Sequence, residues 1–435
     1  MTVSSDKPKR KNTPNRRHKV LLMIVLPIAA LIVGFMALSP QIDAWLATDP
    51  FTPQCHFEED RLFVTGSPPE LRYINQGQFE DIDDGDYSEI VWSPNGEHVI
   101  FPVNQYEYHL YSGEELVQIY DDERNVSRVW WWSPNSKYVA RVNEDRELIV
   151  VDFETNNSLE KFNLGELYYG PIWSPNSKYL IVHEMDNYFL FDVENQLKYL
   201  FTPTSQITNF PVWSNNSEKI YYFKNTDLVA YDIKSDTTVK LITDIDGIAV
   251  KYIDVSPNDK HVVVHHFNNS LILNTQTREV QSISGFHGWL ADDKILQIRT
   301  MGGMPFNKHV EIYDLNIAQS ETIYTYSQDM ERVDISPSNR FILIATQMFF
   351  NGLTRTMMVT SFILYDTEHH QYVRDIEFKN DGWLEWITQD NQDWLVIREK
   401  LNNKDTSPYL TYMYNPAENK KCKLGWTTYS LEFQP

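Results

Sequence analysis

A five-residue turn recurs down this 435-residue chain at a nearly constant interval. The turns are Trp92-Ser93-Pro94-Asn95-Gly96, Trp132-Ser133-Pro134-Asn135-Ser136, Trp173-Ser174-Pro175-Asn176-Ser177, Trp213-Ser214-Asn215-Asn216-Ser217 and Val255-Ser256-Pro257-Asn258-Asp259. Successive turns are 40, 41, 40 and 42 residues apart. Self-similarity at this period predicts that the chain repeats one small structural unit.

Each turn is followed by a short apolar run that predicts a β-strand. The runs are too short for helices and rich in β-branched and aromatic residues, as in residues 179–182 and 220–223. A second predicted strand ends in Asp, at Asp152, Asp192 and Asp232, and a third closes the unit. With the strand that carries the Trp, each unit holds four strands in about 42 residues, which is typical of an all-β fold, the β-propeller.

Three weaker copies continue the pattern, at residues 289–314, 335–366 and 386–415. The chain therefore predicts eight four-stranded blades, with seven as the alternative. Two further strands, at residues 62–64 and 71–74, precede the first turn. One arrangement is that they complete a blade with a C-terminal strand from residues 427–433.

The turn and the aromatic-Asp pair that follows it resemble the WD40-like PD40 repeat of TolB-type propellers. The resemblance covers roughly residues 60–424. It implies a β-propeller fold, and it says little about function because such propellers serve many roles. We expect structural roles for the repeated residues: Ser and Asn bond nearby backbone, Trp fills the space between sheets, and Asp bonds turn amides.

The chain is strongly acidic, with a net charge of −22. Residues 1–19 hold seven Lys or Arg against one Asp, a net +6, so the rest of the chain carries −28. Such a body repels phosphate backbones, and we expect no nucleic-acid partner.

Residues 20–38 form a run of 19 residues without a charge, long enough to cross a membrane as a helix. The basic residues 1–19 precede it directly, and the positive-inside rule places them in the cytoplasm. We predict a cytoplasmic tail at 1–19, a single-pass signal anchor in the cytoplasmic membrane at 20–38, a linker at 39–54 and an extracytoplasmic propeller at 55–435. The rival interpretation of residues 20–38 is a cleaved signal peptide.

The chain has two cysteines, Cys55 before the first predicted strand and Cys422 near the end of the last unit. A closed propeller brings its two ends together. In an exported protein, this placement predicts a disulfide that locks the ring.

Known catalytic and cofactor motifs are absent from the sequence, including G-x-S-x-G, H-E-x-x-H, C-x-x-C and Gly-rich phosphate loops. We therefore expect neither a catalytic centre nor a cofactor or metal. The pairs His265-His266 and His369-His370 are poor chelates, because neighbours on a strand point to opposite faces. A manganese site assembled from several blades stays open as an alternative. The acidic run Asp81, Asp83, Asp84 and Asp86 lacks the Gly and distal Glu of an EF-hand, so we interpret it as a connector.

Three connections lengthen in units six to eight, at residues 299–308, 346–360 and 399–408. The middle one carries Asn351-Gly352, which favours a tight hairpin, so unit seven is predicted to project as an arm. Its apolar residues and those of unit six form a candidate partner-binding patch. The patch consists of Met301, Met304, Phe306, Met348, Phe349, Phe350, Met357 and Met358.

These observations together predict a non-catalytic binding or scaffolding module at the outer face of the membrane. Its expected partner is a protein, with a glycan as the less favoured ligand. The alternative is a propeller enzyme of the polysaccharide lyase or glycosidase type with its site in the central funnel. Converging His, Arg and carboxylate groups at the funnel mouth would favour the enzyme.

Overall fold

The computed structural model describes Pro53, Cys55 and most of residues 62–433. The segments inside that range that lie outside the description are 66–69, 74–78, 82–90, 103–106, 113–114, 122–129, 143–145, 156, 165–169, 185–186, 204–209, 246–249, 267–268, 302–306, 327–331, 352–355, 378–381, 401–408 and 428–430. The predicted tail, membrane segment and linker at residues 1–54 fall almost wholly outside the described residues. Among the described residues, no helix has the length and apolar character needed to cross a membrane.

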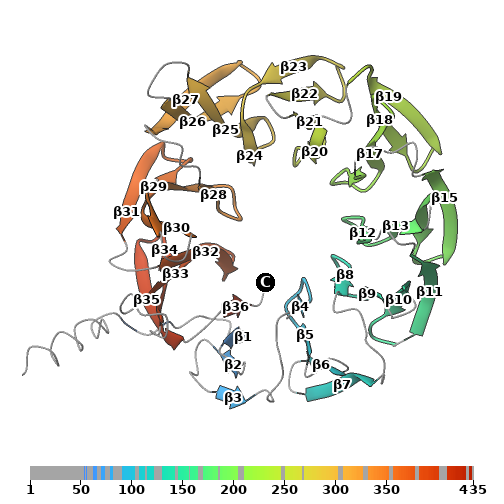
Figure 1. The fold of residues 1–435 in the computed structure, drawn as a ribbon, viewed down its shortest axis with the longest axis horizontal. Coiled ribbons are helices and arrows are strands. Elements are labelled where there is room, and N and C mark those ends of the chain that lie inside the picture. Colours follow the sequence, from blue (N-terminus) through green and yellow to red (C-terminus); the bar gives the residue numbers. More distant parts are fainter. Residues whose placement is uncertain are drawn as a thin grey trace, which may run out of the picture. The chain divides into compact units, whose positions relative to one another are not determined.

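Every described strand belongs to a four-stranded antiparallel sheet, and all of them lie in the unit Gln54–Pro435. Eight of these sheets each use four consecutive strands, numbered here sheet one to sheet eight, and they follow one another around a ring (Figure 1). The first strand of each sheet lies toward the centre of the ring and the fourth at its outside. The predicted all-β propeller architecture is confirmed.

The strands of sheets one to four are short and regular. They are β4 (Val91–Trp92), β5 (His98–Pro102), β6 (Glu107–Ser112) and β7 (Glu115–Asp121) in sheet one; β8 (Trp130–Trp132), β9 (Tyr138–Val142), β10 (Glu147–Asp152) and β11 (Asn157–Asn163) in sheet two; β12 (Ile172–Trp173), β13 (Tyr179–Glu184), β14 (Asn187–Asp192) and β15 (Leu197–Pro203) in sheet three; and β16 (Val212–Trp213), β17 (Lys219–Lys224), β18 (Asp227–Asp232) and β19 (Thr237–Ile242) in sheet four.

The middle strands lengthen in sheets six to eight. The strands are β20 (Val250–Val255), β21 (His261–His266), β22 (Ser270–Asn274) and β23 (Val280–Ile283) in sheet five; β24 (Phe286–Ala291), β25 (Lys294–Met301), β26 (Asn307–Asp314) and β27 (Gln319–Tyr326) in sheet six; β28 (Val333–Ile335), β29 (Phe341–Asn351), β30 (Thr356–Asp366) and β31 (Gln371–Glu377) in sheet seven; and β32 (Gly382–Gln389), β33 (Gln392–Lys400), β34 (Tyr409–Asn415) and β35 (Lys420–Thr427) in sheet eight.

A further sheet, the closing sheet, combines the two ends of this unit. It contains β1 (Leu62–Thr65), β2 (Glu70–Tyr73), β3 (Phe79–Asp81) and β36 (Leu431–Phe433), in the order β3-β2-β1-β36. Phe63 pairs with Phe433, so the C-terminal strand supplies the inner position. The eight predicted repeats are present, and the arrangement in which residues 62–64 and 71–74 complete a blade with a C-terminal strand is confirmed. The described strands thus form nine sheets, one more than the eight predicted blades, because no recurring turn marks the closing sheet. Asp81, predicted to lie in a connector, ends β3, and Asp83, Asp84 and Asp86 fall outside the described residues.

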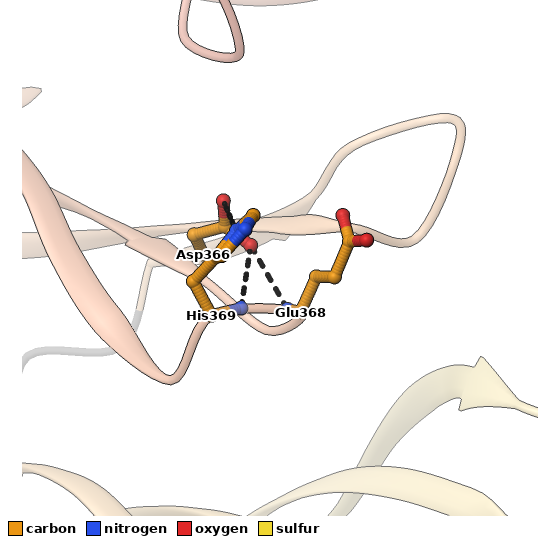
Figure 2. A group of neighbouring side chains, drawn as sticks. All are labelled: Asp366, Glu368 and His369. Atoms are coloured by element: carbon orange, nitrogen blue, oxygen red, sulfur yellow. Dashed lines mark hydrogen bonds and ion pairs between the residues drawn. The ribbon is translucent and has the colours of Figure 1, made fainter.

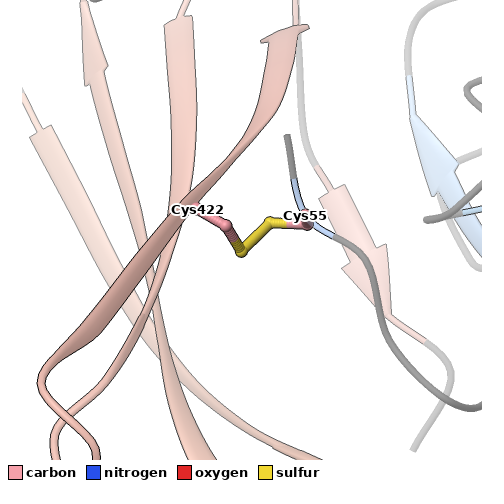
Figure 3. Close-up of a disulfide and its surroundings, with 2 residues drawn as sticks. All are labelled: Cys55 and Cys422. Atoms are coloured by element: carbon pink, nitrogen blue, oxygen red, sulfur yellow. A yellow bond between two sulfur atoms is a disulfide. The ribbon is translucent and has the colours of Figure 1, made fainter. Parts of the chain in front are cut away.

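The predicted disulfide between Cys55 and Cys422 is present, and it joins the segment before β1 to β35 of sheet eight (Figure 3). Cys55 N also donates to Lys423 O at 3.0 Å. Both cysteines are buried beside Trp394, Val396 and Met413 on one face of sheet eight. The bond therefore fixes the start of the ring to its last repeat.

The apolar core is divided among the interfaces between successive sheets. Sheets two and three, for example, meet through Leu148, Phe162, Leu180 and Phe191, each with none of its surface exposed. Burying a side chain of this size contributes about 2 kcal/mol. Because each middle strand is covered on both faces, its apolar run is nearly continuous, which is the pattern seen in the sequence.

The recurring turn is held by its own side chains, as predicted. In the second repeat, Tyr138 N donates to Ser133 Oγ at 2.9 Å, and Ser133 Oγ donates to Asn135 Oδ1 at 2.7 Å. The fifth residue, Ser136, has a left-handed φ of 61°. This conformation explains why Gly, Ser, Asp and Asn occupy that position.

The fifth residue also ties each turn to the preceding one. Ser136, Ser177 and Ser217 each accept the backbone N–H of the Asn in the preceding turn at 2.9 Å. Asp259 Oδ2 does the same for Asn216 N at 2.9 Å, and its Oδ1 also accepts from Asn215 N at 2.6 Å. The recurring residues therefore hold the ring together.

The Trp and Asp positions are structural too. The indole Nε1 of Trp213 donates to Ile172 O of the preceding sheet at 3.1 Å. Asp192 Oδ1 accepts the N–H of Asn195 at 3.0 Å, and Asp232 Oδ1 accepts that of Ser235 at 2.9 Å. These bonds confirm the structural roles predicted for the repeated residues.

Candidate functional site

The extended strands of sheet seven form a two-stranded projection, here called the arm. In the arm, β29 and β30 pair from Met348 opposite Val359 to Asn351 opposite Thr356. The inner strand β28 reaches only to Ile344 of β29, and the outer strand β31 only to Ser361 of β30. An extension of unit seven was predicted. Of the three segments predicted as long loops in units six to eight, the described parts are paired strand, at residues 299–301, 307–308, 346–351, 356–360 and 399–400. Residues 302–306, 352–355 and 401–408 lie outside the described residues.

The predicted apolar patch is only partly described. Met301 ends β25 opposite Asn307 and is 40% exposed. Met304 and Phe306 lie outside the described residues. Met348, Phe349, Phe350, Met357 and Met358 lie in the paired strands of the arm, with side chains that fall outside the description. The patch stays a prediction.

The His residues singled out in the sequence have defined surroundings. His265 is buried, with its ring stacked on Tyr252 at 3.6 Å and against Phe286 at 4.8 Å. Nδ1 of His370 lies 2.9 Å from Oε2 of Glu321. His265 is thus a core residue, and His370 bridges two sheets.

His369 joins Asp366 and Glu368 in a cluster that the sequence analysis missed. Their ligand atoms lie within 4.8 Å of one another, and this is the one such group among the described residues (Figure 2). The backbone N–H groups of Glu368 and His369 donate to Asp366 Oδ1 at 2.9 and 3.2 Å, and Arg340 donates to Asp366 Oδ2 at 2.9 Å. The signal in the sequence is the Asp of the repeated turn followed by acidic and His residues.

Burial alone would raise the pKa of Asp366. Arg340, His369 and the turn amides outweigh that effect and hold the pKa at about 2. The carboxylate is buried and already shared between an arginine and two backbone donors. The cluster is therefore the local form of the recurring Asp turn, with its charge balanced by Arg340.

A cleft of about 460 Å³ opens among the inner strands of sheets six, seven and eight. It is lined by His287, Arg332, Val333, Asp334, Ile335, Leu343, Leu384, Glu385 and Trp386. Its volume falls within the range of ~300–1,000 Å³ that is usual for ligand sites. Because β24, β28 and β32 face the centre of the ring, this cleft is our candidate functional site.

Hydrogen bonds across the three sheets hold the walls of the cleft. His287 Nε2 lies 2.7 Å from Val333 O. Arg332 donates through Nε to Asp334 Oδ2 at 3.2 Å and through a terminal nitrogen to Leu384 O at 3.3 Å. These polar groups are therefore fixed before any ligand arrives.

Glu385 and Trp386 also line the cleft, but the polar atoms of their side chains have no hydrogen bonds to described residues. Glu385 has no hydrogen bond or ion pair to any residue in the described part of the chain, and it lies at an exposed position. Burial of its carboxyl nevertheless raises its pKa, and Arg398 acts in the opposite direction. The Trp386 indole stacks on Phe341 at 6.3 Å, and its Nε1 is buried without a partner among the described residues.

Comparison of the repeats position by position locates this site. The residue before the aromatic position of the turn is apolar in the first four units and changes in the last four. It is Val91, Trp131, Ile172, Val212, Asp254, Gly288, Asp334 and Glu385 in chain order. A Cβ atom at Gly288 would lie 2.9 Å from Ile335 Cδ1, so a side chain there would require the end of Ile335 to move. Departure from the repeat was a signal that the search for whole motifs passed over.

The arm starts beside this cleft. Ala345 N, on β29 just before the arm, donates to Arg332 O at 2.9 Å. Met301 ends the equivalent second strand of sheet six, and equivalent strands in neighbouring sheets end at the same rim. The cleft, the arm and Met301 therefore belong to one side of sheets six and seven.

No family model and no curated protein match this sequence. Among solved structures, a eukaryotic initiation factor is similar at a TM-score of 0.62 with 14% identity, over 87% of this chain and 99% of that one. Porphyromonas gingivalis dipeptidyl peptidase 4 is similar at a TM-score of 0.51 with 11% identity, over 78% of this chain and 59% of that one. The C-terminal WD40 domain of Sif2 is similar at a TM-score of 0.45 with 14% identity, over 72% of this chain and 95% of that one. The first two likenesses concern the fold alone, and the topology of four-stranded sheets around a ring identifies the chain as a β-propeller.

Proposed function

We propose that this chain is a membrane-anchored, extracytoplasmic propeller of the TolB-like, PD40-repeat class that binds a protein partner without catalysing a reaction. The anchor is residues 20–38, on the grounds of their uncharged length and the basic residues before them. The repeat class is proposed from the recurring turn. A glycan is the less favoured ligand.

One observation carries the binding role: the non-repeated features gather on one arc of the ring. Sheets one to five use their recurring side chains to hold neighbouring turns together. Sheets six to eight hold the polar cleft, and sheet seven adds the arm. A scaffold that varies in one arc and repeats elsewhere suits recognition by that arc.

Crosslinking in intact cells, followed by mass spectrometry, tests this role. The test variant replaces residues 349–358 with Asn-Gly, so that Met348 and Val359, already paired, flank a two-residue turn. We expect the crosslinked partner to be lost while the melting temperature stays near that of the wild type. Ile317→Asn, at a 62% exposed position in the outer turn of sheet six, is the matched control and should keep the partner. Equal crosslinking of the shortened variant would argue against the arm.

A propeller enzyme is the second candidate, because the cleft brings together His287, Arg332, Asp334 and Glu385. These are the residue types that lyases and glycosidases use for acid–base work. The test is incubation with uronate-containing and neutral polysaccharides, followed by assays for unsaturated products and for new reducing ends. Activity that disappears in a folded His287→Ala variant would favour the enzyme.

A further inference from the structure

Most charged groups that line the cleft are already engaged with protein. Arg332 is bonded to Asp334 and to a backbone carbonyl, and His287 lies at hydrogen-bond distance from Val333 O. Since Arg332 and Asp334 neutralise each other, Glu385 is left as the unbalanced charge of the lining. The residues that line the cleft therefore carry a net negative charge when Glu385 is ionised, and Arg398 on the neighbouring strand β33 offsets part of it.

The surroundings reinforce this sign. Beyond residues 1–19 the chain carries a net −28, which draws cations toward the ring and repels anions. An anionic ligand would meet Glu385 with no free cation among the described lining residues to offset it.

A metal ion does not fit the arrangement. Three ligand atoms of His, Cys, Asp or Glu come within 4.8 Å of one another only at Asp366, Glu368 and His369 among the described residues. The carboxylates of Asp334 and Glu385 thus do not converge with His287 on one point. The cleft suits an organic cation. The delocalised or diffuse charge of such a cation can lie beside the carboxylate of Glu385, and its alkyl chain can pack against the indole ring of Trp386.

Trp386 lines the same cleft as Glu385 and supplies that ring. Ammonium and guanidinium groups are attracted to an indole face, and their alkyl stems pack on apolar walls such as Leu343 and Leu384. A guanidinium or ammonium group also gives Glu385 the charge-assisted hydrogen bond it lacks among described residues.

We propose that this cleft binds a Lys or Arg side chain of the protein partner, with Glu385 as the carboxylate that receives it. The proposal rests on the proposed protein-binding function and adds the chemical class of the group recognised. The cleft volume exceeds that of one side chain, so it also admits the flanking peptide.

Calorimetric titration of the full-length protein in detergent with three small probes tests the proposal. The probes are N-acetyl-arginine amide, N-acetyl-lysine amide and the neutral isostere N-acetyl-citrulline amide. We expect the two cations to bind, and the citrulline probe to bind at least ~10-fold more weakly, a difference of about 1.4 kcal/mol. Glu385→Gln should weaken binding of the two cationic probes by a similar factor. Glu377→Gln, at an exposed position on outer strand β31, should leave that binding unchanged.

The pH dependence separates charge from shape. Because the pKa of Glu385 is raised, cation binding should fall as the pH drops through that raised value, and Glu385→Gln should remove the dependence. The other charged groups facing this carboxyl are Arg398 on β33, Arg332 just before β28, Asp334 on β28, and His287 on β24.

Equal binding of the arginine and citrulline probes, or unweakened binding by Glu385→Gln, would overturn the proposal. The proposed function fails separately: crosslinking that captures no partner while the probes bind rejects only the protein-binding role. A captured partner together with probes that do not bind rejects only the assignment of the cleft.

Discussion

The hydroxyl of Ser177 accepts a hydrogen bond from the backbone N–H of Asn135, 2.9 Å away in the preceding repeat. Ser177 is 2% exposed and holds a left-handed φ of 62°. The same bond recurs between other turns, so a single side-chain oxygen per repeat sets the spacing of neighbouring turns.

Replacing Ser177 with Ala should destabilise the contact between sheets two and three. The loss leaves the Asn135 N–H without its acceptor, which costs about 1–2 kcal/mol. Hydrogen exchange at the Asn135 amide should then accelerate by ~5–30-fold, while amides of sheet eight stay protected. Ser177→Gly, which also lacks the hydroxyl but tolerates the positive φ, separates the hydrogen bond from backbone strain. Unchanged exchange at Asn135 in both variants would contradict the role assigned to Ser177.

Removal of the disulfide by Cys55→Ser and Cys422→Ser should lower the melting temperature. A crosslink closing a loop this long stabilises by up to ~5 kcal/mol in the chain-entropy model. The first amides to lose protection should be those of β1 and β36, because the bond fixes the segment before β1 to sheet eight. Peptide mapping without reductant provides the check on the wild type, where alkylation of either thiol would count against the bond.

Arg299→Met should make the stability of sheet six depend on pH. Glu311 is fully buried and accepts from Arg299 at 2.7 Å and from Gln297 at 2.8 Å. Burial works to raise the pKa of Glu311, but these donors keep it below its usual value. Without Arg299 the pKa of folded Glu311 should rise above its unfolded value. The variant should then be less stable than the wild type at neutral pH, by about 3 kcal/mol, and regain stability as the pH falls.

The control for that experiment is Arg299→Met combined with Glu311→Gln. It removes the buried charge together with its partner and should be stable without a pH dependence between neutral and mildly acid solution. Thermal melts at several pH values measure both variants. If the melting temperature of the Arg299→Met variant fell on acidification in parallel with that of the wild type, this account of Glu311 would be disproved.

Asp366 should contribute to acid denaturation at the low end of the pH scale. Its pKa is held at about 2, below the unfolded value, so its stabilising effect is complete above pH ~4 and is lost as the pH falls toward 2. Asp366→Asn should therefore melt at a lower temperature at neutral pH and lose less on acidification through that window. Glu368→Gln should behave like the wild type, because the Glu368 side chain is 62% exposed.

The repeat period, the turn residues and the two cysteines were enough to predict the propeller and its disulfide. The turn residues act locally, through hydrogen bonds to groups within five residues. The repeat period and the placement of the two cysteines near the two ends follow from the closure of a ring. The closing sheet was harder, since β3 carries no repeat signal and β36 pairs with a strand at the opposite end of the chain.

The cleft could not be predicted from single motifs. His287, Arg332 and Glu385 come from three different repeats, and they share a site only because the ring sets their sheets side by side. The change from Val91, Trp131, Ile172 and Val212 to Asp254, Asp334 and Glu385 was visible in the sequence. Distances between these side chains depend on the packing of whole sheets, which no spacing in the sequence reports.

The pairing of β1 with β36 imposes an order on folding. Translation produces β1 among the first strands and β36 last, while each of sheets one to eight becomes complete within a single stretch of the growing polypeptide. Nucleation can thus proceed repeat by repeat, whereas one edge of β1 waits unpaired until β36 has been synthesised. Formation of that one non-local ladder is the slowest contact to assemble, and the waiting edge is the place where a nascent molecule is most open to pairing with another.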